Sequence, residues 1–149
     1  MSHVTLIDLE VHDLSALRAT CDELGLELCE GQKTFKWFGR HMGDYAIPEG
    51  FTKADMGKCD HVIKVKGNPN AYEIGVVKRR DGKPGYILMW DFWQGGYGLQ
   101  AAVGKGCHKL CQQYAAKVTA KQAQALIAKG FSQHKSVNAQ GEIILRYTK

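Results

Sequence analysis

This sequence has few prolines and no long apolar run. Only 3 of its 149 residues are proline. No apolar run approaches the roughly 18 residues that a membrane-spanning helix needs. The first ten residues, MSHVTLIDLE, contain acidic side chains and lack the basic-then-apolar pattern of a secretory signal. We therefore expect a cytoplasmic protein without a membrane segment.

Disulfide bonds and strong net charge are not expected either. The five cysteines are an odd number in a chain without an export signal, which indicates reduced thiols. Hydrophobic residues make up 44% and charged residues 23%, as in a globular protein, and residues 1–149 suffice for one domain with its own core. The net charge of +5 favours anionic partners but lies below that of an obligate DNA-binding protein.

The motifs of common catalytic sites are missing as well. The chain has no G-x-S-x-G or H-E-x-x-H motif, and Lys105 is followed by Gly106 where a phosphate-binding P-loop needs Ser or Thr. On a helix His108 would point about 100° away from Cys107, so their adjacency does not indicate a catalytic pair. We expect a non-enzymatic protein without a cofactor, while the sequence leaves catalysis open.

Four cysteine and histidine residues are the candidate metal ligands. Cys107 and Cys111 lie one helical turn apart, and Cys59 and His61 lie two residues apart at the start of a predicted strand. Thiolates and imidazoles bind zinc, but this spacing matches no zinc finger or ribbon. Cys107 and Cys111 also fit a buried helix stripe, so our expectation is no metal site.

The hydrophobic pattern predicts an α+β domain, with a mainly antiparallel sheet and helices packed on one face. Residues 3–11 alternate as a strand whose two apolar faces indicate a central position. Asp13 is placed to cap a helix that ends at Gly25. A short strand is expected near Thr34–Gly39. Further strands are expected at residues 61–66, 71–80 and 86–93, the last two joined by a turn at Asp81–Gly82.

Two helices and a hairpin complete the predicted order β-α-β-β-β-β-α-α-β-β. The first helix is expected over residues 99–117. Thr119 with Gln122 forms a capping box for the second, which ends at Gly130. The last strands are expected on either side of a turn, NAQG, that follows FSQHKSV and precedes EIILRY.

The order of several short segments resembles one known family. MSH opening a strand, DELGLEL closing the β-α unit, YEIGVV in a middle strand, and QQYAAKV, AKGFSQ and GEIILRY near the end are similar to the hypothetical chloroplast reading frame 35 proteins. This family, also called domain of unknown function 1257, comprises small uncharacterised proteins of plastids and cyanobacteria, with similar proteins in phages. The resemblance covers most of the chain except residues 40–58, which look like an inserted loop.

The resemblance implies little about activity. The family has no assigned reaction and no accepted catalytic residues, so none can be transferred to this chain. Its association with ATPase partners in cyanobacteria implies an adaptor role. A phage origin would imply location in the host cytoplasm.

Cationic and aromatic residues in the middle of the chain indicate a ligand site. Trp93 and Tyr97 lie in the stretch WDFWQGGYGLQ, and Arg79, Arg80 and Lys105 flank it in sequence. If the basic turn and the two rings meet at one hollow, the rings can stack on a base while the cations bind phosphate. We therefore predict that these five residues bind an anionic, nucleotide-like small molecule. The protein would act as a sensor, or as a phage sponge of a host signalling nucleotide.

Two other functions stay open. The loop 40–58 could contact a protein partner such as an ATPase. The apolar residues that would form this contact are Met42, Tyr45, Ile47, Phe51 and Met56. The positive net charge also allows general nucleic-acid binding, with an affinity that falls steeply with salt. The oligomeric state does not follow from the sequence.

Overall fold

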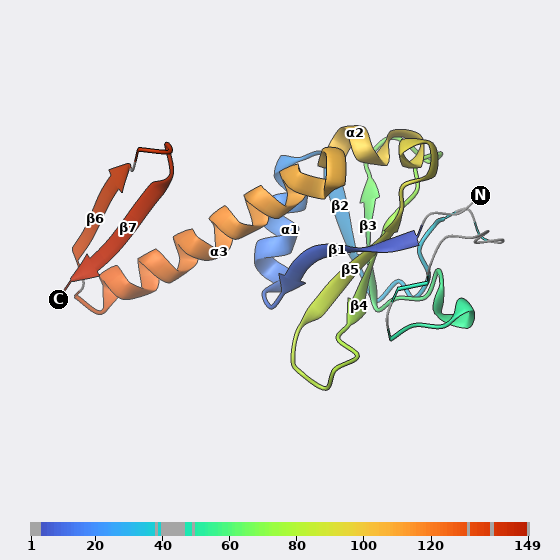
Figure 1. Cartoon of the computed structure of the whole chain (residues 1–149), viewed down its shortest axis with the longest axis horizontal. Helices are drawn as coiled ribbons and strands as arrows, with labels where there is room; N and C mark the ends of the chain where they lie inside the picture. Colours follow the sequence, from blue (N-terminus) through green and yellow to red (C-terminus); the bar gives the residue numbers. More distant parts are fainter. Residues whose placement is uncertain are drawn as a thin grey trace. The chain divides into compact units, whose positions relative to one another are not determined.

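The computed structural model describes residues 4–37, 39, 47–48, 50–130, 132–137 and 139–148 (Figure 1). The chain groups into two compact units, unit 1 at Met1–Tyr114 and unit 2 at Ala115–Lys149, where the sequence predicted one domain. None of the described helices is both long and apolar enough to cross a lipid bilayer.

Unit 1 is built on a five-stranded antiparallel sheet in the order β1-β5-β4-β3-β2. Its strands are β1 (Val4–Val11), β2 (Leu26–Glu30), β3 (His61–Val65), β4 (Ile74–Lys78) and β5 (Tyr86–Asp91). All strands except β2 lie within the ranges predicted from the sequence. β4 and β5 form the predicted hairpin, with Lys78 opposite Tyr86. The α+β class with a mainly antiparallel sheet is therefore confirmed.

The β-α unit at the start of the chain follows the predicted pattern. Helix α1 (Leu14–Glu23) begins after Asp13, whose side chain accepts a hydrogen bond of 3.0 Å from the backbone N–H of Ala16. The helix ends before Gly25, which has a φ of +72° that few other residues adopt. The predicted cap and stop are thus confirmed.

Two predictions about strands are wrong. The sequence places residues 3–11 at the centre of the sheet, but β1 lies at an edge beside β5. The sequence also predicts a strand near Thr34–Gly39. The strand is instead β2, which begins directly after Gly25, and Thr34 forms an isolated bridge with Lys58. The alternation of leucine and glutamate in the segment LELCE was the sequence signal for this strand, and the burial of its side chains follows that alternation.

The helices that follow β5 are divided differently from the prediction. They are η2 (Trp93–Gly98), α2 (Leu99–Val103), η3 (Lys105–Cys107) and α3 (His108–Ala128). Gly104 and Gly106 have φ values of +87° and +63° and interrupt the helical path there. Thr119 and Gln122 lie inside α3, so the predicted capping box and second helix start are wrong.

Both faces of the sheet in unit 1 are covered, which explains why β5 is buried at four consecutive residues, Leu88–Asp91. On one face, Phe35 and Met56 from irregular segments join a buried cluster with Val77 and Met89. α1, α2 and the start of α3 gather against the sheet on the other face (Figure 1). The helices therefore pack on one face, as predicted.

Unit 2 contains the remainder of α3 and a two-stranded hairpin of β6 (Ser132–Val137) and β7 (Ile143–Thr148). Six residue pairs form its ladder, from Ser132 opposite Thr148 to Val137 opposite Ile143. The predicted terminal hairpin is confirmed. The boundary between the two units lies within α3, after Tyr114.

Candidate functional site

Directly after β5 the backbone runs through four consecutive residues in the left-handed region. Gln94, Gly95, Gly96 and Tyr97 have φ values of 52°, 65°, 64° and 54°. Glycine adopts this conformation freely, but each non-glycine residue there loses roughly 1–2 kcal/mol. Gln94 and Tyr97 are therefore strained, and the turn depends on contacts that hold it in place.

Three hydrogen bonds hold this turn on the sheet. The buried carboxylate of Asp91 accepts a hydrogen bond of 3.0 Å from the backbone N–H of Trp93. The N–H of Tyr72 donates to the carbonyl of Gly96 at 2.8 Å, and the side-chain amide of Asn68 donates to the carbonyl of Tyr97 at 3.2 Å. The turn is thereby fixed between the end of β5 and the segment before β4.

A cleft lies beside this turn at the β1 edge of the sheet, and we refer to it as the Trp90 cleft. It has a volume of about 460 Å³ and is lined by Thr5, Leu6, Ile7, Trp90, Phe92, Gln100, Lys105 and Gly106. A second hollow of about 400 Å³ is lined by Gln94, Gly95, Gly98, Gln100, Ala101 and Lys105. Because Gln100 and Lys105 line both, the two cavities adjoin each other.

The aromatic part of the cleft comes from the last residues of β5 and the residue after it. The ring centroids of Trp90 and Phe92 are 6.2 Å apart, with the planes tilted by 45°. Trp90 is only 4% exposed and forms a buried wall, whereas the ring of Phe92 is half-buried. Phe92 therefore offers the more accessible aromatic surface to a ligand.

The cleft has a positive local charge. The side chain of Lys105 is exposed, and its backbone carbonyl is bonded to the ring Nδ1 of His108 at 2.9 Å. No carboxylate is among the residues that line the Trp90 cleft or the adjoining hollow. An anion would thus meet one ammonium group and the amide of Gln100 without facing a like charge.

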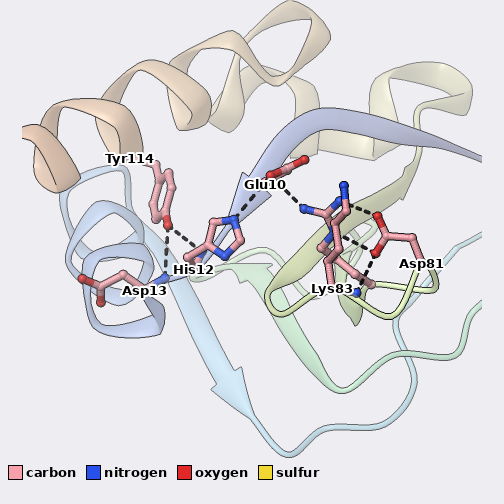
Figure 2. Close-up of polar contacts among 7 residues, drawn as sticks. Glu10, His12, Asp13, Asp81, Lys83 and Tyr114 are labelled. Atoms are coloured by element: carbon pink, nitrogen blue, oxygen red, sulfur yellow. Dashed lines mark hydrogen bonds and ion pairs between the residues drawn. The ribbon is translucent and has the colours of Figure 1, made fainter.

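Arg79 lies at the opposite end of β5 from this cleft and is held by two carboxylates, those of Glu10 and Asp81, which Figure 2 labels. Its Nη1 is 2.8 Å from Glu10 Oε2, and its other nitrogens bond the carboxylate of Asp81. The side chain is 13% exposed. The hydrogen bond from Arg79 is the main cause that lowers the pKa of Asp81. Arg79 is therefore already neutralised within the fold.

Arg80 is paired in the same way. Its Nη2 lies 3.6 Å from Asp55 Oδ1, and its guanidinium carbon lies 4.8 Å from the centre of the Phe51 ring. Hydrogen bonds from the backbone N–H and the side chain of Thr52 also lower the pKa of Asp55. This arginine fixes the segment around Phe51 on the surface of unit 1.

The predicted meeting of the basic turn and the rings at one hollow is wrong. Lys78 lies opposite Tyr86 at the start of β5, while Trp93 and Tyr97 follow the end of that strand. At about 3.3 Å per residue the six-residue strand separates the two sites by about 17 Å. Among the five predicted residues, Lys105 lines the cleft.

The two predicted rings lie beside the cleft and do not line it. Trp93 is half-buried and is not among the residues of either cavity. Tyr97 is 49% exposed and packs edge-on against Tyr72, with ring centroids 5.1 Å apart. Burial is the main cause that raises the pKa of Tyr72. Tyr97 therefore has one side of its ring against Tyr72 and the rest exposed to solvent, outside the cleft.

The four candidate metal ligands form hydrogen bonds of their own. Cys59 Sγ donates to the carbonyl of Gln32 at 3.3 Å, and His61 Nδ1 accepts from the N–H of Gly31 at 2.9 Å. Burial raises the pKa of the Cys59 thiol to about 12. Cys107 is buried, and its hydrogen bond with Cys111 raises its pKa. Among the described residues, no group of three or more potential ligands is arranged to hold a metal.

Part of the proposed protein-contact loop belongs to the core. Met56 is buried in the cluster on one face of the sheet, and Ile47 and Phe51 pack against that cluster. A short helical turn, η1 (Lys53–Asp55), lies between them. Met42 and Tyr45 lie outside the described residues. Met56 is therefore a core residue, while Ile47 and Phe51 are half-buried against the core and keep part of their surface exposed.

No family model, curated protein or solved structure matches this chain. The resemblance to the reading frame 35 family therefore stays a prediction from the sequence. The candidate site is therefore identified only from the positions of its own residues in the structure.

Proposed function

We propose that this chain is a non-enzymatic binding protein and that the Trp90 cleft takes a small anionic molecule with a flat ring system, such as a nucleotide. The observation that carries this proposal is that one cavity is lined by an exposed lysine and by two aromatic side chains, Lys105, Trp90 and Phe92. A ring can contact Phe92 while a phosphate pairs with the ammonium group.

The size and the chemistry of the cleft support this assignment. Ligand cavities usually have volumes of about 300–1,000 Å³, and the Trp90 cleft has about 460 Å³. The amide of Gln100 can donate and accept hydrogen bonds at the edge of a base. Lys105 is the one titratable side chain among the residues that line the cleft, and the lining holds no histidine, cysteine or carboxylate to form an acid–base pair with it. Binding without reaction suits a sensor or a sponge of a signalling nucleotide.

Thermal unfolding in the presence of linear and cyclic nucleotides tests the proposal. A ligand at 100 times its Kd stabilises the folded state by about 2.7 kcal/mol, which raises Tm by roughly 5–10 °C in a protein of this size. We expect such a shift for at least one nucleotide, together with a change in tryptophan fluorescence because Trp90 forms a wall of the cleft. The absence of any shift at millimolar nucleotide would contradict the proposal.

A matched pair of lysine variants locates the site. Lys105 and Lys109 are both exposed, but Lys109 is not among the residues that line the cleft. Lys105→Gln should weaken nucleotide binding by about tenfold or more at low salt, because it removes a phosphate partner. Lys109→Gln removes the same charge and should leave the affinity unchanged. An equal loss in both variants would show that only the net charge matters.

A further inference from the structure

The positive charge of this protein is concentrated in its C-terminal unit. Unit 1, residues 1–114, contains 14 basic and 14 acidic residues and has no formal net charge. Unit 2, residues 115–149, contains six basic residues and one acidic residue, which gives +5, the net charge of the whole chain. The basic residues of unit 2 are Lys117, Lys121, Lys129, Lys135, Arg146 and Lys149. The chain thus combines unit 1, in which basic and acidic residues are equal in number, with the strongly cationic unit 2.

The two units differ in whether their cations can be neutralised locally. In unit 1 the carboxylates equal the cations in number, and ion pairs such as Arg18 with Glu30 and Arg79 with Glu10 form across its surface. In unit 2 the only carboxylate side chain is that of Glu142. One carboxylate cannot balance six cations, so unit 2 has a positive field that favours an anionic partner.

The hairpin of unit 2 presents exposed hydrogen-bonding side chains on one face. His134 lies opposite Arg146, and Ser132 lies opposite Thr148, so these four positions share a face of the ribbon. All four residues are exposed, and His134 Nε2 lies 2.9 Å from Thr148 Oγ1. By alternation, Val137 and its partner Ile143 belong to the opposite face. Ser136 and its partner Ile144 also belong to the first face, and Lys135 belongs to the opposite one. The first face is therefore mainly polar and the other more apolar, and each includes one lysine or arginine position.

We propose that unit 2 binds duplex DNA, with the polar face of the β6–β7 ribbon in the major groove and the lysines on the phosphate backbone. A two-stranded antiparallel ribbon fits the width of the major groove. Arginine, lysine, serine and threonine are donors that contact phosphates, and arginine and lysine also bind base edges. The site is independent of the Trp90 cleft, which lies in unit 1 and is proposed for a small ligand.

Fluorescence anisotropy with a labelled 20-base-pair duplex and the full chain tests this. Six cations allow a slope of log K against log salt as steep as about −5, since each phosphate contact contributes roughly −0.9. We expect micromolar or tighter binding at 50 mM NaCl that weakens steeply as salt rises. No binding at 20 mM NaCl would overturn the proposal.

Two triple variants with the same net charge show whether DNA binding depends on the cations of unit 2 or only on the total charge of the chain. Lys121, Lys129 and Arg146 in unit 2 are exposed, as are Lys33, Lys58 and Lys109 in unit 1. K121Q/K129Q/R146Q should make the salt slope shallower by about 3 and reduce the affinity by about 100-fold at 0.1 M salt. K33Q/K58Q/K109Q should leave both values nearly unchanged. Equal effects of the two triple variants would overturn the assignment to unit 2.

Other anionic partners are distinguished by parallel measurements. The same protein is titrated with a single-stranded 20-mer, with a 20-residue polyglutamate peptide, and with vesicles containing phosphatidylserine. Duplex DNA should bind at least tenfold more tightly than each of these at 100 mM NaCl. Tighter binding of the peptide or the vesicles would overturn the proposal in favour of an acidic protein or a lipid surface. Nucleotide binding by the Trp90 cleft can be present or absent in either case.

Discussion

The hydroxyl of Tyr114, near the start of α3, accepts a hydrogen bond of 3.0 Å from the backbone N–H of His12, at the end of β1 (Figure 2). The same oxygen lies 3.2 Å from the backbone nitrogen of Asp13, the residue that caps α1. One side chain therefore satisfies two backbone donors and connects α3 with β1 and the start of α1, which lie about 100 residues earlier in the sequence.

Replacing Tyr114 with phenylalanine should lower the free energy of unfolding by about 1–3 kcal/mol, because two part-buried N–H groups lose their acceptor. Urea unfolding measures this change. Tyr97→Phe is the control, since Tyr97 is half exposed, and its effect should be under about 0.5 kcal/mol. Equal effects of the two substitutions would show that the Tyr114 hydroxyl has no special structural role.

Gly75→Ala should destabilise unit 1 by about 1–3 kcal/mol through overpacking. A Cβ at this position would lie 2.4 Å from Cδ1 of Phe35, whose ring packs directly on the β4 backbone. In a Phe35→Ala background the same substitution should have little effect, because the obstructing ring is gone. The double-mutant cycle measured by urea unfolding gives the coupling energy, and additive effects would contradict this contact.

Gln94→Gly should stabilise the protein by about 1 kcal/mol, because Gln94 has a φ of 52° that glycine adopts without strain. Gln100→Gly is the matched substitution within the right-handed helix α2, where glycine should destabilise by a similar amount. Opposite signs of the two changes in Tm are expected. A loss of stability in Gln94→Gly would show that its side chain holds the turn.

The stability of the folded state should fall as pH rises above 9. Burial raises the pKa of Cys21 and of Cys59 from 9.0 to about 12. The unfolded chain then releases protons that the folded chain retains, so the stabilisation is complete below pH 9 and is lost between pH 9 and about 12. Each thiol contributes up to about 1.4 kcal/mol per pH unit. In urea unfolding between pH 8 and 10.5, Cys59→Ala should show a shallower pH dependence than the natural sequence; an unchanged dependence would contradict the pKa of Cys59.

Local signals in the sequence were sufficient for much of the fold. The cap at Asp13, the stop at Gly25 and the turn at Asp81–Gly82 depend on a few neighbouring residues, and the elements they delimit lie as predicted. The edge position of β1 was not predictable in this way. It depends on a pairing with β5 that spans about 80 residues, and the apolar residues on both faces of β1 include Val4 and Ile7, which are buried, and Leu6, which stays exposed.

The candidate site was predicted less well, for the same reason. Trp90 and Phe92 belong to one face of their strand by alternation, but the β1 wall of the cleft depends on the long-range pairing. Arg79 and Arg80 were predicted to bind the ligand because the sequence shows which side chains are charged but not which opposite charges lie beside them. In the fold, Glu10 and Asp55 lie beside them.

The pairing of the first strand with the fifth determines when the sheet can close during protein synthesis. β2, β3 and β4 can form their ladder as soon as they leave the ribosome, but β1 has no neighbour until residues 86–91 emerge. At about 5–20 residues per second this wait lasts several seconds. Throughout it the apolar residues of β1 lack the strand that pairs with them in the folded sheet.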